Sequence, residues 1–409
     1  VRTDIYAFGI VLYQLLNKGF NPLDNTQYTH VDTRMDTQDE RAFPRADTLK
    51  SRHGVDILRK CLQQNPSARY QTFTELEEDL IQALQILNPQ YQFTPTKEDP
   101  LNAEEYFGKG LGWDRLQDYH KVIQNYDKAI ELNPQHAGTY NNRGSAKANL
   151  KNYMGAIADY DKVIALDPKY VAAYNNRGHV KYDLRDYAGA IADYNNAIEL
   201  DTKNMNTYYN RGNSKANLKD YTGAIADYNK AVELDPKYVA AYNNRGSAKD
   251  DLKDYAGAIV DYDKAIELDT KNMNAYYNRG NSKANLKDYA GAIADYNKAI
   301  ELDPQYADAY NNRGIAKKNL GDYAGAIADY NKAIELDPQY AKAYNNRGGA
   351  KANLKDYAGA IADYGKAIEL FPQYTRVYDN LIALYRELKL PEKAEEIRRL
   401  KQKNCPDNQ

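Results

Sequence analysis

Apolar and small residues recur along most of this chain in one pattern that repeats every 34 residues. The copy that spans residues 171–204 shows it clearly, because its apolar and small side chains fall at spacings of three and four in two separate stretches. These positions are Tyr174, Gly178, Tyr187, Ala190, Ile191, Tyr194, Ala197, Ile198 and Leu200. Such spacing is typical of two short amphipathic helices, and a fixed period of this length predicts a solenoid of stacked helices.

Eight copies of the pattern follow one another over residues 103–374. Their first residues are Ala103, Ala137, Val171, Met205, Val239, Met273, Ala307 and Ala341. We expect Asp186 to begin the second helix of its copy, because a carboxylate oxygen can accept a hydrogen bond from the free amides of a first turn. We also expect Gly178, Ala190 and Ala197 to lie where the two helices cross, since only small side chains let the backbones approach.

The residue types at these positions resemble those of the tetratricopeptide repeat. The order is aromatic, Gly, aromatic, Ala, aromatic, Ala, and most copies close with a proline: Pro134, Pro168, Pro236, Pro304, Pro338 and Pro372. The resemblance implies an all-α fold over residues 103–374, a right-handed superhelical solenoid of paired antiparallel helices. Residues 375–409 keep Ala394 in phase but are more charged, and we expect them to form a degenerate ninth repeat that caps the stack.

The N-terminal part of the chain has a different pattern. Residues 4–16, DIYAFGIVLYQLL, predict a helix with an apolar stripe, and so do residues 74–87; residues 55–64 predict a short helix and residues 65–69 a turn. Residues 4–16 resemble the long central helix in the large lobe of a eukaryotic-type protein kinase, and residues 61–80, CLQQNPSARYQTFTELEEDL, resemble the closing segment of that lobe. Asp4 then matches the aspartate that braces the catalytic loop, and Arg69 the arginine that pairs with the end of the activation segment. The alternative interpretation is that Asp4 merely caps a helix and Arg69 lies in a surface turn.

The resemblance implies a truncated kinase lobe over residues 1–87, and the three prolines of residues 88–102 predict a linker. Kinase chemistry needs a Gly-rich loop, a strand lysine, an H-R-D catalytic loop and a D-F-G aspartate. None of these occurs in the 409 residues, so we predict no catalytic residue, and whether the chain belongs to an enzyme stays open. Because it begins at Val1, we interpret it as a fragment. A longer parent could be a Ser/Thr kinase that uses ATP and magnesium.

Composition narrows the class of partner. The 55 basic and 57 acidic residues give a net charge of −2, which argues against nucleic acid as the main partner. Cys61 and Cys405 are far apart in the sequence and favour a reducing, cytoplasmic setting. No apolar run approaches the roughly 18 to 20 residues of a membrane span, and the histidines lack the spacing of metal ligands. The repeats favour a protein or an extended peptide as partner, and the oligomeric state stays open.

Asparagine recurs on one stripe of the first helix of each copy. Counted from the first residue of a copy, positions 2, 6, 9 and 13 share that stripe, which in this family faces the concave groove. The sixth position is asparagine in seven consecutive copies: Asn142, Asn176, Asn210, Asn244, Asn278, Asn312 and Asn346. The thirteenth is Asn149, Asn217, Asn285, Asn319 and Asn353, with aspartate in the other two copies.

A carboxamide offers both a donor and an acceptor, so this ladder could hold an extended peptide by its backbone. It resembles the asparagine ladder in the repeats of O-linked N-acetylglucosamine transferases. The alternative is that duplication of the repeats simply copied the asparagine. A basic clamp for terminal carboxylates, found in chaperone-binding members of the family, is disfavoured, because Lys318 and Lys342 are exceptions on a stripe of Asn, Asp, Ala and Ser.

Two cations in each copy depart from the family pattern. Arg177 and Lys181 fall near positions of the first helix that pack against its neighbours, where apolar residues are usual. A buried cation needs a partner, and the second helix of each full copy supplies an aspartate, such as Asp193. We therefore predict an Arg–Asp pair that is repeated along the stack.

Overall fold

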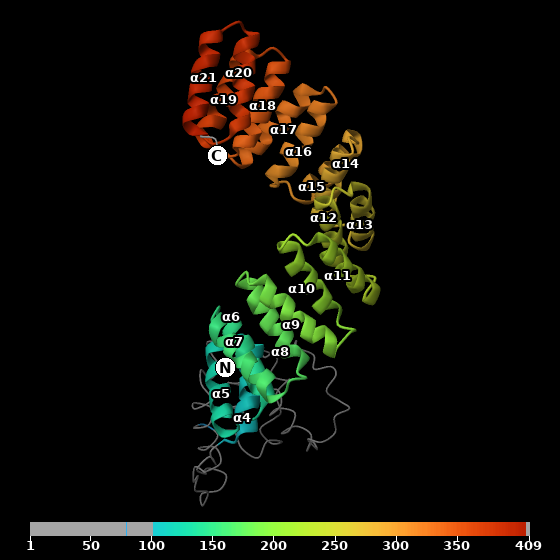
Figure 1. Ribbon diagram of the computed structural model, residues 1–409, viewed down its shortest axis with the longest axis vertical. Coiled ribbons are helices and arrows are strands. Elements are labelled where there is room, and N and C mark those ends of the chain that lie inside the picture. The colour runs from blue at the N-terminus through green and yellow to red at the C-terminus, as the bar shows by residue number, and fades with distance from the viewer. Residues whose placement is uncertain (1–78, 80–100, 406–409) are drawn as a thin grey trace, which may run out of the picture. The chain divides into compact units, whose positions relative to one another are not determined.

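The computed structural model describes residue 79 and residues 101–405 (Figure 1). The chain divides into two compact units, Val1–Leu101 and Asn102–Gln409. Asp4, Arg69 and, apart from Asp79, the whole expected kinase-like segment lie outside the described residues. Within the described part of the second unit, eighteen α-helices follow one another without a strand, which confirms the all-α class.

The helices come in pairs of thirteen and fourteen residues. The first helices are α4 (Ala103–Arg115), α6 (Ala137–Asn149), α8 (Val171–Asp183), α10 (Met205–Asn217), α12 (Val239–Asp251), α14 (Met273–Asn285), α16 (Ala307–Asn319), α18 (Ala341–Asn353) and α20 (Thr375–Glu387). The second helices are α5 (Tyr119–Leu132), α7 (Tyr153–Leu166), α9 (Tyr187–Leu200), α11 (Tyr221–Leu234), α13 (Tyr255–Leu268), α15 (Tyr289–Leu302), α17 (Tyr323–Leu336), α19 (Tyr357–Leu370) and α21 (Pro391–Asn404). Each second helix packs on its own first helix, and each one before α21 also packs on the first helix of the next pair.

Backbone hydrogen bonds end the first helix of a repeat, and one aspartate begins the second. After α8, Arg185 takes a φ of 62°, and the amides of Arg185 and Asp186 donate to the carbonyls of Tyr182 and Lys181, both at 2.9 Å. This closure satisfies the last carbonyls of the helix. The carboxylate of Asp186 then accepts a hydrogen bond from the amide of Gly189 at 2.9 Å, so the predicted cap of α9 is confirmed.

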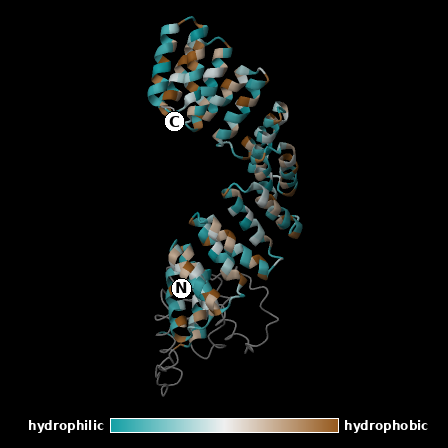
Figure 2. Ribbon diagram, viewed as in Figure 1, coloured by the Kyte–Doolittle hydropathy of each residue, from teal (hydrophilic) through white to brown (hydrophobic). Residues whose placement is uncertain are grey.

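The interface between the two helices of a repeat sets a tyrosine against a glycine. Tyr194, Ala190 and Ala197 have no exposed surface, and a Cβ atom at Gly178 would lie 2.8 Å from the Tyr194 ring. Any larger residue would therefore force the helices apart, which confirms the expected crossing. Figure 2 shows the resulting alternation of hydrophobic and hydrophilic residues along the helices of the stack.

The predicted Arg–Asp pair is confirmed and has additional partners. The guanidinium of Arg177 donates to both oxygens of Asp193, and Lys181 reaches the same carboxylate at 2.8 Å. The third Arg177 contact runs to Asp161 of the preceding repeat. The arrangement recurs at Arg143, Arg211, Arg245, Arg279, Arg313 and Arg347. A buried carboxylate in each repeat is thus neutralised by two cations, and the arginine links that repeat to its neighbour.

The last helix pair closes the described stack with a larger apolar cluster. Val377, Tyr378, Leu381 and Leu384 of α20 pack together with residues of α19. Ala394 of α21 is buried, whereas most residues of α21 are polar. This helix pair therefore presents a polar outer surface, as a terminal repeat of a solenoid requires.

Candidate functional site

The sixth-position asparagines lie half-buried on the first helices, and four of them donate hydrogen bonds to the preceding repeat. The side-chain amide of Asn244 donates to the Asn213 carboxamide at 2.8 Å and to the Tyr209 hydroxyl at 3.0 Å, both in the preceding repeat. Asn312 makes the same two contacts with Asn281 and Tyr277, both at 3.0 Å. The side-chain amide hydrogens of Asn244 and Asn312 are therefore used in hydrogen bonds to the preceding repeat.

Two further sixth-position asparagines each make a single bond to the fifth-position asparagine of the preceding repeat. Asn176 donates to Asn141 at 3.1 Å, and Asn346 donates to Asn311 at 3.0 Å. Asn380 extends the series into the last repeat by donating to Asn345 at 2.8 Å. Sequence reasoning missed these fifth-position partners, although the recurrence of Asn or Tyr there is a signal that could have found them.

The thirteenth-position residues are exposed at the ends of the first helices. Asn319 and Asn353 each donate to the carbonyl four residues earlier, at 2.9 and 2.8 Å. Asn217 donates to the Asn213 carbonyl at 2.9 Å and to the Tyr182 hydroxyl at 3.1 Å. The side-chain oxygens of these asparagines accept no hydrogen bond from the described residues. These oxygens are therefore available to a ligand.

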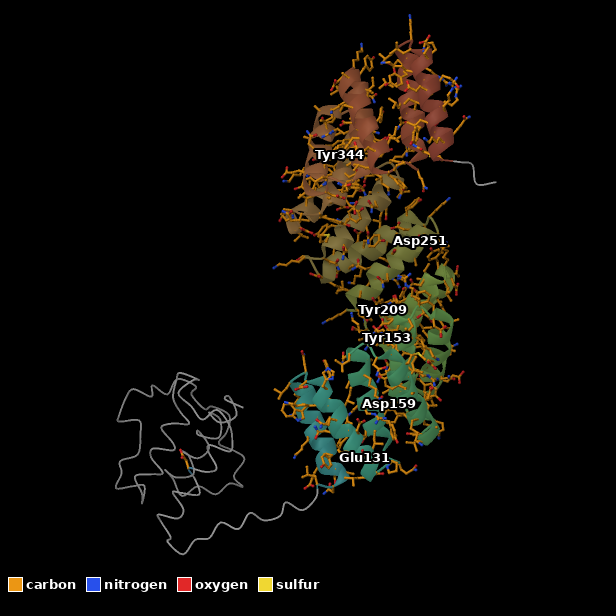
Figure 3. All side chains as sticks on the ribbon, turned by 90° about the vertical axis from the view of Figure 1, so that its left-hand side faces the viewer. Glu131, Tyr153, Asp159, Tyr209, Asp251 and Tyr344 are labelled. Carbon is orange, nitrogen blue, oxygen red and sulfur yellow. The ribbon has the colours of Figure 1, made fainter. Side chains whose placement is uncertain are left out.

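Two hollows open on the stripe of first-helix residues. The first has a volume of about 340 Å³ and is lined by Tyr209, Asn213, Asn217, Asn244 and Asp251, among others. Figure 3 labels Tyr209 and Asp251 within the stack. Tyr228 forms part of its wall, and burial raises the pKa of this phenol.

The second hollow, of about 280 Å³, lies near the C-terminal end of the described helices. Lys318, Asn346, Asn353, Arg376 and Asn380 line it, together with Glu387. Burial, and then the positive charge of Arg376, lower the pKa of Lys318. Each hollow therefore joins a sixth-position asparagine to a thirteenth-position asparagine, and the two hollows differ in charge.

Asp250 stands at the twelfth position of its copy, where four other copies have alanine. Asp250 accepts hydrogen bonds from the hydroxyl of Ser282 at 2.7 Å and from that of Tyr262 at 2.8 Å. Burial raises the pKa of Asp250 despite both hydrogen bonds. Because Ser282 belongs to the following repeat, this carboxyl group is a further link within the stack.

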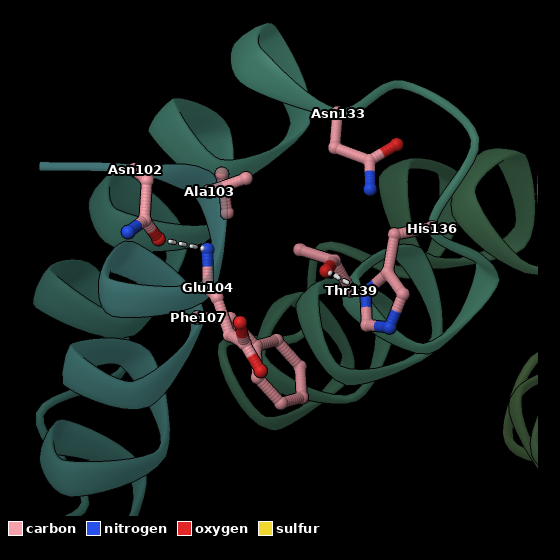
Figure 4. A pocket seen from close by; sticks show the side chains of 8 residues that line it. Asn102, Ala103, Glu104, Phe107, Asn133, His136 and Thr139 are labelled. Carbon is pink, nitrogen blue, oxygen red and sulfur yellow. Dashed lines mark hydrogen bonds between the residues drawn. The ribbon is translucent and has the colours of Figure 1, made fainter.

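A separate pocket lies at the start of the described helices (Figure 4). It has a volume of about 440 Å³ and includes Asn102, Phe107, His136 and Thr139 in its lining. The rings of Phe107 and His136 meet edge to face at 5.2 Å, and His136 Nδ1 lies 2.6 Å from the Thr139 hydroxyl. None of the predicted asparagines lines this pocket, so it is distinct from the two hollows.

Within residues 101–405, no three His, Cys, Asp or Glu side chains are placed to hold a metal ion. Among the same described residues, no helix has both the length and the apolar character needed to cross a membrane. The predicted structural pair of the kinase-like segment, Asp4 and Arg69, cannot be placed because both lie outside the described residues.

Family models match both parts of the chain. A model described as "TPR repeat" matches residues 144–184, 181–219, 251–287 and 280–321. Models described as "Tetratricopeptide repeat" match residues 206–238, 307–340 and 341–374, and residues 125–158. The model "Protein tyrosine and serine/threonine kinase" matches residues 1–80, which include Asp4 and Arg69. No curated protein sequence matches the chain significantly.

Several solved structures are similar to parts of the stack. MamA is 30% identical, with a TM-score of 0.38 over 40% of this chain and 96% of that chain. YrrB, described as a TPR protein with an unusual peptide-binding site, is 25% identical, with a TM-score of 0.41 over 46% and 96%. A repeat protein from Cytophaga hutchinsonii is 23% identical, with a TM-score of 0.49 over 58% and 98%.

The repeat models together cover more than half of the chain, and the matched regions coincide with the helix pairs described above. The chain therefore belongs to the tetratricopeptide repeat family.

Proposed function

We propose that the solenoid is a binding scaffold that holds an extended segment of a partner protein along the stripe of first-helix residues. The main support for this proposal is the hollow at Tyr209, because it holds a free hydrogen-bond donor beside a free acceptor. The Tyr209 hydroxyl accepts a hydrogen bond from Asn244 and keeps its own hydrogen for donation. The Asn244 side-chain oxygen accepts no hydrogen bond from the described residues. One free donor beside one free acceptor complements a peptide group.

The asparagines divide between two roles in this proposal. Four sixth-position residues form the floor, because their amide hydrogens bind the preceding repeat and hold the side chains in place: Asn176, Asn244, Asn312 and Asn346. The exposed thirteenth-position residues form the rim, where their free oxygens can accept hydrogen bonds from a backbone. Such contacts read the peptide backbone and place little demand on its sequence.

The test uses the full chain and a displayed library of random linear peptides. The groove variant is Asn217→Arg with Asp251→Arg, because both side chains are exposed and line the first hollow. Its matched control is Thr222→Arg with Glu233→Arg, which makes the same change of charge at exposed positions of α11.

We expect the groove variant to weaken binding of the selected peptides at least about tenfold, a loss of ~1.4 kcal/mol. We expect the control to bind like the unmodified chain, as measured by fluorescence anisotropy. Equal weakening by both variants would place the ligand elsewhere, and failure to select any peptide would refute the proposal.

A second function rests on the kinase-model match to residues 1–80. Here the chain is the C-terminal portion of a longer Ser/Thr kinase, and the repeats bring a substrate or regulator to its catalytic domain. The intact mass and N-terminal sequence of the protein purified from its source test this. Upstream Gly-rich, H-R-D and D-F-G elements would support it, and a native chain that starts near Val1 would exclude it.

A further inference from the structure

The first hollow combines aromatic rings with an unpaired carboxylate. Tyr182 of α8, Tyr209 of α10 and Asp251 of α12 line it, and no lysine or arginine is among its lining residues. Asp251 is exposed, and its carboxylate forms no ion pair or hydrogen bond with any described residue. The lining of this hollow therefore has a net negative charge.

The two partly exposed tyrosines are held in place by their neighbours. The Tyr182 hydroxyl accepts a hydrogen bond from the Asn217 side chain at 3.1 Å, and the Tyr182 ring meets that of Tyr187 edge to face at 5.3 Å. The ring of Tyr209 packs on that of Tyr238, with centroids 4.9 Å apart. An aromatic ring attracts a cation placed over its face, so the rings and the carboxylate favour the same kind of ligand.

The polar atoms of the hollow that remain free are mostly acceptors. Asn217 and Asn244 donate their amide hydrogens to tyrosine hydroxyls, and their side-chain oxygens accept no hydrogen bond from the described residues. The carboxylate of Asp251 adds further acceptor sites. Ammonium and guanidinium groups carry only donors, and their hydrogen bonds to a carboxylate are charge-assisted. The hollow therefore matches an organic cation.

This combination of a ring and an acid occurs once within residues 137–374. Tyr182 is the only tyrosine at the twelfth position of these copies, and the others have Ala148, Ala216, Asp250, Ala284, Lys318 and Ala352. Two repeats later the sequence keeps a tyrosine at Tyr277, but has Asn319 in the place of Asp251. Duplication of the repeats has therefore not copied the cation-binding chemistry of the first hollow.

We propose that the hollow lined by Tyr182, Tyr209 and Asp251 binds the cationic side chain of a Lys or Arg residue in the peptide held in the groove. This inference rests on the proposed function. The peptide backbone still pairs with Tyr209 and Asn244, while the cationic side chain reaches Asp251. The hollow thus adds one sequence requirement to a groove that otherwise reads the backbone, and it sets the register of the peptide along the repeats.

The second hollow has the opposite charge. Lys318 and Arg376 line it, and the side chains of both form no ion pair or hydrogen bond with any described residue. A cationic residue of the peptide is repelled there. The charges along the stripe therefore direct such a residue to the first hollow.

The experiment uses the full chain on an array of random linear peptides with acetylated N-termini and amidated C-termini, so that every peptide charge belongs to a side chain. The variants are Asp251→Asn, which introduces the residue of five other copies, and Tyr182→Ala, which introduces that of four. The matched control is Glu233→Gln, because Glu233 is an exposed carboxylate of α11 that does not line the hollow. Circular dichroism checks that each variant is folded.

We expect the unmodified chain and the control to select peptides that contain Lys or Arg, and both hollow variants to lose that selection. For one selected peptide, fluorescence anisotropy should show that Asp251→Asn weakens binding on the order of tenfold. Replacing the peptide cation by a neutral analogue, citrulline for Arg or acetyl-lysine for Lys, should cost as much in the unmodified chain and clearly less in Asp251→Asn. Added salt should weaken binding by the unmodified chain more than binding by Asp251→Asn.

The outcomes separate the two proposals. If peptides bind without enrichment of Lys or Arg and both hollow variants bind the same set, the cation site is refuted and the groove function stands. Enrichment that persists in both variants would place the cation elsewhere and would also refute the site. If no peptide binds, both proposals are refuted. Loss of binding with citrulline identifies a guanidinium as the ligand group, and loss with acetyl-lysine identifies an ammonium.

Discussion

The cations around each buried aspartate predict a stability effect that is not additive. In the fifth repeat, Asp261 has a side-chain exposure of 2% and meets Lys249 at 2.8 Å, while Arg245 Nε donates to it at 3.0 Å. Arg245 also donates to Asn229 of the preceding repeat at 2.7 Å. Because two cations neutralise one carboxylate, either can be removed without leaving a bare buried charge. Only removal of both does so.

The expected magnitudes follow from that arrangement. Arg245→Leu removes hydrogen bonds to a charged group and leaves Lys249 in place, which we expect to cost about 1.5 kcal/mol. Lys249→Met removes one contact of a partly exposed ammonium and should cost about 1 kcal/mol. The double variant leaves the buried Asp261 unpaired, and breaking a buried pair in this way costs roughly 3–5 kcal/mol. We expect about 4 kcal/mol, which exceeds the sum of the single effects by about 1.5 kcal/mol.

The assay must report on the repeat itself, because a solenoid need not unfold as one cooperative unit. Native-state hydrogen exchange of the α12 and α13 amides, combined with urea unfolding, measures the local free energy of opening. Lys264→Met is the control, since Lys264 forms only an exposed surface pair with Glu267 at 2.7 Å, and it should change stability by less than ~0.5 kcal/mol. The reasoning would be refuted if the loss of stability in the double variant equalled the sum of the losses in the single variants. An increase in stability with Arg245→Leu would show that the pair contributes specificity at most.

Three further predictions concern single residues. Gly246→Ala should destabilise the repeats by about 1–3 kcal/mol in urea unfolding, because its Cβ would lie 2.8 Å from the Tyr262 ring. Its control is Gly365→Ala, where a Cβ would have no atom nearby, and this variant should stabilise the protein by about 0.5–1 kcal/mol. Burial raises the pKa of Asp250, so its contribution to stability is lost as pH rises through the folded-state pKa, and Asp250→Asn should remove that part of the pH dependence of thermal unfolding. Thr270→Pro should stabilise by up to about 1 kcal/mol, because the preceding residue has an extended backbone and other copies carry proline there; unchanged unfolding would contradict it.

The regular part of the fold could be predicted from the sequence because one set of side chains is repeated at one period. The Tyr194 and Gly178 positions predict the crossing of two helices, and Arg177 with Asp193 predicts the buried pair, since both members of each contact lie within one repeat. Contacts between repeats could not be predicted in this way. Asn244 donates to Tyr209 and Asn213 of the preceding repeat, and the periodicity within a copy does not encode how adjacent repeats pack.

The predicted asparagine stripe shows the same limit. Its residues lie on one face of the first helices, but the sequence did not reveal that the sixth-position amides bind the preceding repeat. Lys318 is an exception to the stripe in the sequence, but its place beside Arg376 could not be predicted, because the two residues belong to repeats that are not adjacent in sequence. Departures of one copy from the others were the signal that could have identified this hollow.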